Sequence, residues 1–301
     1  VSAWRKTVSG DLTSAFRPWL PADQEKLPFL QKVPFIESIF NARFREAPSN
    51  FKVLTAEEIA EISRDPAASA LMPKQEPGIK PACALPYQLY ADGNLNAGKT
   101  HFEIRMEARN EIFGERSAGS PFNIYIPAKY AATDPQGRTA PFEYSGARSY
   151  AVAAGGLLIE SWPLKSFENG IYHLRLYGPN GFYREYRGDE KDPDIMVRCG
   201  YERNPLNSRK LTGKWQIVVK NNDARNACRL EIRDLAYNMK PVTRLIPAGA
   251  TEKITLDQDK SFGWYDYGLY IKGYDHFEKR YAGRIETGED GFSDPRMGGI
   301  I

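Results

Sequence analysis

The sequence of 301 residues predicts a mainly β protein, made of two tandem immunoglobulin-like β-sandwich repeats that follow a partly helical, irregular segment. Three observations predict this fold class. Aromatic residues are abundant, with 17 Tyr, 15 Phe and 5 Trp. The 21 Pro and 25 Gly punctuate the chain, which suits many short strands joined by tight turns. Finally, residues 165–188 recur as residues 260–283.

This recurrence aligns without a gap, and nine positions are identical. In the first copy they are Lys165, Ser166, Phe167, Tyr172, Leu174, Gly178, Phe182, Tyr186 and Gly188. Tyr172, Leu174 and Leu176 alternate along one side before a glycine turn at Gly178, so each copy is predicted to contain a hairpin. The pattern Tyr-x-Leu-x-Leu-x-Gly is typical of strand F in immunoglobulin-like sandwiches.

The recurrence divides the chain into three predicted regions. Residues 1–81 form a leading segment with a proline-rich linker, residues 82–190 a first β-sandwich repeat, and residues 191–301 a second. The charged stretch GDEKDPD, residues 188–194, is predicted to link the repeats. In the leading segment, Thr55 and Glu58 form a capping box that predicts a short helix.

One short stretch raises the question of nucleotide binding. Residues 93–100, GNLNAGKT, fit the phosphate-binding pattern G-x-x-x-x-G-K-[ST]. That pattern requires a helix to begin at its lysine, but the following residues alternate between apolar and polar as a half-buried strand does. We therefore expect a hairpin with an exposed Lys99, and no nucleotide.

Composition excludes several other classes. The chain has 41 Lys plus Arg against 38 Asp plus Glu and no basic run interleaved with aromatics, so no nucleic acid is expected. No apolar run is long enough to span a membrane. The sequence opens without an initiator methionine or a signal-like segment, which predicts a fragment or a processed product.

No cofactor or metal is predicted. Cys83, Cys199 and Cys228 lack the spacing of a zinc site and allow at most one disulfide, whose pairing stays open. Two acidic stretches are predicted to be turns rather than calcium sites: one contains Asp257 and Asp259, and the other is residues 289–294. Neither has the ordered ligand spacing of a calcium-binding loop.

Four separated motifs stand out: WRKTVSGDLTSAF from Trp4, FREAPSNFKVLTAEEIAEI from Phe44, MPKQEPGIKPACALPYQLYADG from Met72 and GERSAGSPF from Gly114. Together, and in this order, they resemble the C-terminal part of the bacterial phosphocholine-specific phospholipases C. In that family a large hydrolase domain precedes two copies of a small β-rich domain. The resemblance implies that residues 1–81 include the tail of the hydrolase domain.

The same resemblance implies a parent that is exported, to the periplasm or beyond, and that hydrolyses phosphatidylcholine, in some members sphingomyelin, to release phosphocholine. The family's metal and nucleophile motifs belong to the hydrolase domain, so no catalytic residue is carried over to this chain. His101, His173 and His276 are widely spaced and match no hydrolase motif. Whether the chain alone is an enzyme stays uncertain, and we expect that it is not.

The recurrence also divides the aromatic residues into those predicted to be structural and those predicted to bind a ligand. Aromatic residues shared by both copies are expected to be structural: Tyr172, Phe182, Tyr186, Tyr267, Phe277 and Tyr281. Aromatic residues of the second copy that the first copy lacks at the matching positions are candidates for binding a choline headgroup or a membrane surface: Trp264, Tyr265, Tyr270 and Tyr274. Aromatic faces can hold a quaternary ammonium, but the same rings could instead pack against a neighbouring domain.

Two functions remain. The first is an accessory region that stabilises or positions the N-terminal hydrolase domain, its expected partner. The alternative is an independent β-sandwich module that binds a membrane surface, such as phosphatidylcholine, choline headgroups or a cell-surface partner. The opening segment favours the first, since a free binding module has no need of a tail that resembles the end of another domain.

Overall fold

The structure is a computed structural model whose described residues fall into two compact units. The described ranges are 31–47, 49–65, 68–71, 77–131, 140–144 and 146–301. Residues 16–76 form one unit, and residues 77–301 belong to the other. Each unit is taken by itself below.

The unit of residues 16–76 contains two helices in its described part, α2 (Lys32–Ala42) and α3 (Ala56–Arg64). The predicted capping box of α3 is confirmed, because Thr55 Oγ1 accepts from Glu58 N and Glu58 Oε2 accepts from Thr55 N. Helix α2 was not predicted. None of the described residues of this unit is buried.

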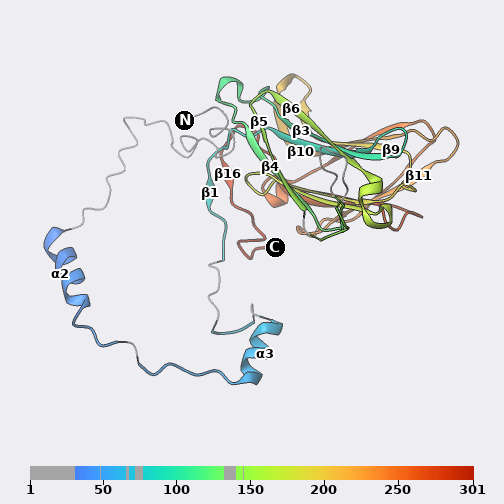
Figure 1. Cartoon of the computed structure of the whole chain (residues 1–301). Coiled ribbons are helices and arrows are strands. Elements are labelled where there is room, and N and C mark those ends of the chain that lie inside the picture. Colours follow the sequence, from blue (N-terminus) through green and yellow to red (C-terminus); the bar gives the residue numbers. More distant parts are fainter. Residues whose placement is uncertain (1–30, 48, 66–67, 72–76, 132–139, 145) are drawn as a thin grey trace. The chain divides into compact units, whose positions relative to one another are not determined.

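Residues 77–301 form the β body shown in green to red in Figure 1. Its first seven long strands are β2 (Leu89–Leu95), β3 (His101–Ala108), β4 (Ser120–Ile126), β5 (Gly146–Val152), β6 (Gly156–Pro163), β7 (Tyr172–Tyr177) and β8 (Tyr183–Gly188). The next seven are β9 (Ile195–Asn204), β10 (Asn207–Asn221), β11 (Cys228–Asp234), β12 (Val242–Ile246), β13 (Thr251–Leu256), β14 (Trp264–Ile271) and β15 (Glu278–Arg284).

Both sets of seven strands pair in the same order, and every pairing is antiparallel. One layer holds the three-stranded sheets β2-β3-β6 and β9-β10-β13. The other layer is a single sheet of eight strands, ordered β12-β11-β14-β15-β8-β7-β4-β5. The mainly β class is confirmed, and a split of three strands against four is what an immunoglobulin-like sandwich has. We call β2–β8 the first sandwich and β9–β15 the second.

The hairpin predicted for residues 93–100 is present. Strand β2 turns at residues 96–100 and pairs with β3, in which Phe102, Ile104 and Met106 are fully buried. Alternation of apolar and polar residues forces this strand to bury one face and expose the other. The expectation of an exposed Lys99 is wrong: the residue is half-buried, and its Nζ donates to the main-chain oxygen of Asp192 over 2.5 Å.

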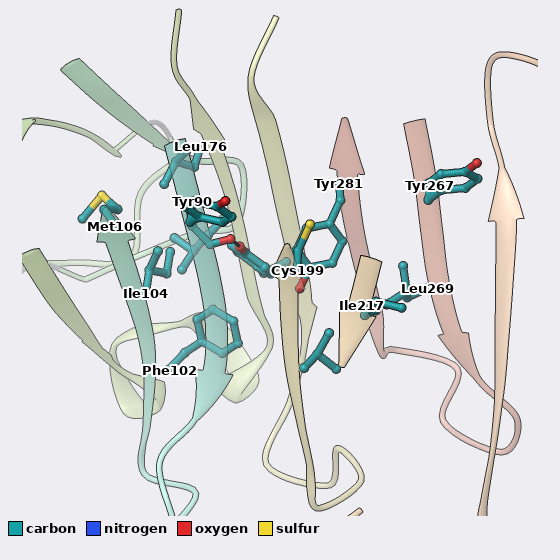
Figure 2. Close-up of a cluster of buried hydrophobic side chains, with 14 of the residues drawn as sticks. Tyr90, Phe102, Ile104, Met106, Leu176, Cys199, Ile217, Tyr267, Leu269 and Tyr281 are labelled. Carbon is teal, nitrogen blue, oxygen red and sulfur yellow. Dashed lines mark hydrogen bonds between the residues drawn. The ribbon is translucent and has the colours of Figure 1, made fainter. Parts of the chain in front are cut away.

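The two sandwiches share one hydrophobic core. Strands β8 and β15 pair from Tyr183↔Ala282 to Arg187↔Glu278, so the eight-stranded sheet has no break between the sandwiches. Buried side chains of both sets form one cluster. Figure 2 shows labelled side chains from Met106 in the first sandwich, past Cys199 and Tyr281, to Tyr267 in the second. We call the region around β8, β15, β2 and β9 the joint.

The stretch GDEKDPD lies between the sandwiches as predicted, but it is packed rather than open. Asp192 is buried, and its carboxylate accepts from Tyr172 Oη over 2.6 Å and from Asp189 N over 3.0 Å. A buried carboxylate needs such partners, because an unpaired charge away from water is costly. The turn is therefore held against the first sandwich.

The C-terminal end of the chain is tied to the start of the β body. Strand β1 (Pro81–Ala82) pairs with β16 (Gly291–Phe292). Lys80 N donates to Ser293 Oγ, and Gly78 N donates to Gly298 O. The residues that lead into the first sandwich are thus held by the last residues after the second. Four short 3-10 helices complete the described elements: Gly114–Arg116, Leu164–Ser166, Glu168–Gly170 and Asp259–Ser261.

A matched pair of tyrosines tests how the joint is stabilised. Tyr186 Oη donates to Ala91 O over 2.8 Å, whereas the buried hydroxyl of Tyr281 has no hydrogen-bond partner among the described residues. We expect Tyr186→Phe to lower the free energy of unfolding by about 1–3 kcal/mol, because it leaves a buried carbonyl unpaired. Tyr281→Phe should leave it unchanged or raise it. Urea unfolding of both variants checks this, and equal losses would contradict it.

Candidate functional site

The structure does not bring the four candidate aromatic residues together. They lie on β14 and in the turn after it, and alternation along β14 sends Tyr265 inward and Trp264 and Tyr270 outward. Tyr265 is buried, accepts from an Arg184 terminal nitrogen over 3.1 Å and lies 3.0 Å from Tyr201 Oη. It has no surface for a ligand to contact.

Trp264 lies at one end of the outer face, away from the other candidates. Its Nε1 donates to Phe292 O over 3.0 Å, which fastens the C-terminal strand β16. With Tyr237, Asp266 and Arg280 it lines a hollow of about 210 Å³. Two of the four charged residues that line this hollow neutralise each other, because Arg280 holds both oxygens of Asp266 at 2.7 and 2.6 Å.

Tyr270 and Tyr274 lie together at the other end of the same face. They line a groove of about 490 Å³. The Arg233 guanidinium covers the ring of Tyr270, 4.6 Å from its centroid, and is held there by two hydrogen bonds to Glu231 at 2.9 and 2.7 Å. One ring of the proposed choline site is therefore already occupied by a cation of the chain.

The six aromatic residues shared by both copies are all buried in the β body. They are Tyr172, Phe182, Tyr186, Tyr267, Phe277 and Tyr281. The hydroxyls at the two strand F positions find different partners: Tyr172 donates to Asp192, and Tyr267 accepts from Gln258 Nε2 over 2.9 Å. Burial of a large ring with a paired hydroxyl is what a structural role requires.

The joint contains two buried cations that sequence reasoning missed. Arg184 on β8 and Lys279 on β15 occupy equivalent positions of the recurrence, and both are buried at the core. Arg184 donates to Ala282 O over 2.9 Å and to Tyr265 Oη. Lys279 Nζ donates to Gly93 O and to Asn94 Oδ1, each over 2.7 Å. Each cation reaches from its own sandwich into the other.

Side chains also join β2 to β9 at this point. Asn94 exchanges two hydrogen bonds with the main chain of Val197, and Asp92 Oδ1 accepts from Cys199 N over 2.8 Å. Burial raises the pKa of Asp92 to about 6 and lowers the pKa of Lys279 to about 8. The pKa of Cys199 is raised to about 12 by burial, so its thiol is protonated and unreactive at neutral pH. Cys199 and Cys228 form no disulfide.

The shifted pKa of Asp92 predicts a pH dependence of stability. Its folded pKa lies above the ordinary value of 3.8, so the folded state holds a proton that the unfolded state releases between pH 3.8 and about 6. Stability contributed by the protonated carboxyl is full below this window and lost as pH rises through it. Relative to Asp92→Asn, which keeps the acceptor oxygen, the native chain should lose about 3 kcal/mol across the window.

Urea unfolding of both proteins across this pH window measures the difference directly. A free-energy difference that stays constant with pH would mean that Asp92 remains ionised in the folded state, and the description of the joint would then be wrong.

No hydrolytic constellation is visible among the described residues. His173 Nε2 lies 2.6 Å from Glu185 Oε1, and His276 Nδ1 lies 2.8 Å from Asp189 Oδ2. A histidine held by a carboxylate could serve as a base, but no serine, threonine or cysteine of the described ranges hydrogen-bonds to either ring. His101 Nδ1 contacts Thr100 Oγ1. In the same part of the chain, no group of three or more His, Cys, Asp or Glu side chains could hold a metal ion.

Comparison with known proteins shows similarity to bacterial phospholipases C. Residues 81–189 match the family model of the bacterial phospholipase C, C-terminal domain. The matched residues correspond closely to β1 through β8, that is, to the first sandwich and its lead-in strand.

Three curated relatives match almost the whole chain. A non-hemolytic phospholipase C of Pseudomonas aeruginosa is 30% identical over 99% of this chain and 38% of its own length. A non-hemolytic phospholipase C of Burkholderia pseudomallei is 27% identical over 98% of this chain and 36% of its own length. A hemolytic phospholipase C of Pseudomonas aeruginosa is 28% identical over 99% and 39%, respectively. The chain thus spans less than two fifths of the length of these relatives.

Across the described residues, no helix is both long and apolar enough to cross a membrane.

Proposed function

We propose that this chain is the C-terminal accessory region of an exported phospholipase C, which hydrolyses phosphatidylcholine, and in some cases sphingomyelin, to release phosphocholine. Its role is to stabilise or position the hydrolase domain, which carries the catalytic groups. The similarity to three phospholipases C along almost the whole chain supports this proposal, because each relative is much longer than the chain.

The exposed apolar side of α2 is the observation that best supports a role in positioning the hydrolase domain. Its five apolar residues are each about half or more exposed: Val33, Phe35, Ile36, Ile39 and Phe40. At 100° per residue these lie on one side of the helix, and Glu37, Ser38 and Asn41 lie on the other. An isolated helix of 11 residues is marginal in water, so this one needs a partner surface to be stable.

The occupant of this apolar side is the hydrolase domain of the parent protein. The curated relatives extend well beyond the matched part, so a large portion of such a protein lies outside this chain. Phe44, Phe51 and Val53 follow α2 along the chain and are also exposed, and the Phe44 ring contacts that of Phe40, which extends the apolar surface beyond the helix by one ring. Exposed apolar surface of this kind marks a protein interface.

A complementation experiment tests the proposal. The purified chain and a separately expressed hydrolase domain of the same parent are mixed, and turnover of a phosphocholine ester is measured for each alone and for the mixture. We expect no turnover by the chain alone, and binding to the hydrolase domain that raises its activity or thermal stability.

Two variants of α2 sharpen this test. Ile36→Asp puts a charge on the apolar side, and we expect it to weaken binding to the hydrolase domain about tenfold or more. Ser38→Asp puts the same charge on the polar side of the same helix and should leave binding unchanged. A hydrolase domain that is fully active alone and does not bind the chain would remove the accessory role.

A further inference from the structure

The groove that contains Tyr270 and Tyr274 lies on the outer face of the eight-stranded sheet, over β11, β12 and β14. Leu230 and Ile232 of β11 and Leu269 and Ile271 of β14 point inward and are buried. Alternation along each strand therefore turns their neighbours outward. The outward set that lines the groove is Arg229, Glu231, Arg233, Tyr270 and Lys272.

Two cations in this groove face each other directly. Leu230 pairs with Ile271, and Lys272 N donates to Arg229 O over 3.1 Å, so Arg229 and Lys272 are opposite neighbours on adjacent strands. Like charges at directly opposed positions destabilise a sheet. Both residues are exposed, and within the described part of the chain neither side chain makes a hydrogen bond or an ion pair.

Two of the other charged groups that line the groove form an ion pair with each other. Glu231 is held by Arg233 through two hydrogen bonds. A second hollow of about 290 Å³ shares Arg229, Lys272 and Tyr274 with the groove. Two acids line this second hollow and not the groove: Asp194 accepts from Asn222 Nδ2, and Asp223 accepts from the main chain of Arg225 and Asn226, all of them uncharged donors.

Asp275, in the turn beside Tyr274, is the acid lining the groove that has no partner among the described residues. The two unpaired cations outnumber it, so the groove favours an anion over a cation. This differs from the choline site expected from the aromatic residues alone, since Arg233 already covers the face of Tyr270.

We propose that Arg229 and Lys272 bind the phosphate group of a small ligand or of a lipid headgroup in this groove. Two neighbouring cations match the charge of a phosphate, and hydrogen bonds between ionised partners are the strong ones. A phosphate between them also relieves their mutual repulsion. A volume of about 490 Å³ accommodates a headgroup-sized molecule, with Tyr270 and Tyr274 to contact whatever the phosphate carries. This proposal does not depend on the accessory role proposed above.

Titrations of the full chain test the site. Inorganic phosphate and phosphocholine are added separately at constant ionic strength, and the amide resonances of Arg229 and Lys272 are followed. Vesicles of phosphatidylcholine and vesicles of phosphatidylglycerol are tested in parallel by co-sedimentation. Saturable shifts with the soluble ligands support a small phosphate ligand, whereas binding to vesicles alone supports a lipid headgroup as the source of the phosphate.

Three variants locate the binding. Lys272→Ala and Arg229→Ala should each weaken binding about tenfold or more, since each removes one charge-assisted contact. Lys253→Ala removes the same charge from the exposed face of β13, in the other sheet of the same sandwich, and should leave binding unchanged. All three changes are at the surface, and thermal unfolding confirms that the variants fold.

Two results would overturn the inference. One is the absence of binding to either soluble ligand and to both kinds of vesicle. The other is an equal loss of binding in Lys253→Ala and Lys272→Ala, which would show attraction to the overall charge of the second sandwich rather than to this groove.

Discussion

The pairing of β8 with β15 is the interaction on which the rest of the β body depends. Each four-stranded sheet alone would expose one of these strands as an unpaired edge, a surface prone to aggregation. Because the two edges pair with each other, both are covered and the two sheets become one. This pairing buries Arg184 and Lys279 in the joint, where each side chain donates to an oxygen of the opposite sandwich.

The pairing of β8 with β15 also determines which outer surfaces are continuous. Because β8 pairs with β15, the outer face of the eight-stranded sheet is continuous across both sandwiches, which lie in one compact unit. Function on this face then depends on the outward residues of β11 and β14, where Arg229 and Lys272 meet. The apolar side of α2 belongs to the other unit, and we propose a different purpose for it, the attachment to a hydrolase domain.

Much of the fold could be predicted from sequence, but the joint could not. Tyr172 and Tyr267 reveal equivalent strands because identical residues recur at one spacing, and Thr55 with Glu58 predicts a helix start from local chemistry alone. A recurrence cannot say which strand edges meet, so Arg184 and Lys279 read as ordinary strand cations. The groove could be predicted only in part. Tyr270 and Tyr274 are recognisable in the sequence as aromatic residues of the second copy, but Arg229 and Lys272 become neighbours only when β11 pairs with β14.

Amide hydrogen exchange of the full chain tests most directly the claim that the two sandwiches form one unit through β8 and β15. The account predicts that amides of these two strands exchange as slowly as those of β3 and β10 in the cores, and that all four strands open in one event. Fast exchange at β8 and β15 while β3 and β10 stay protected, or separate opening of the two sandwiches, would contradict it.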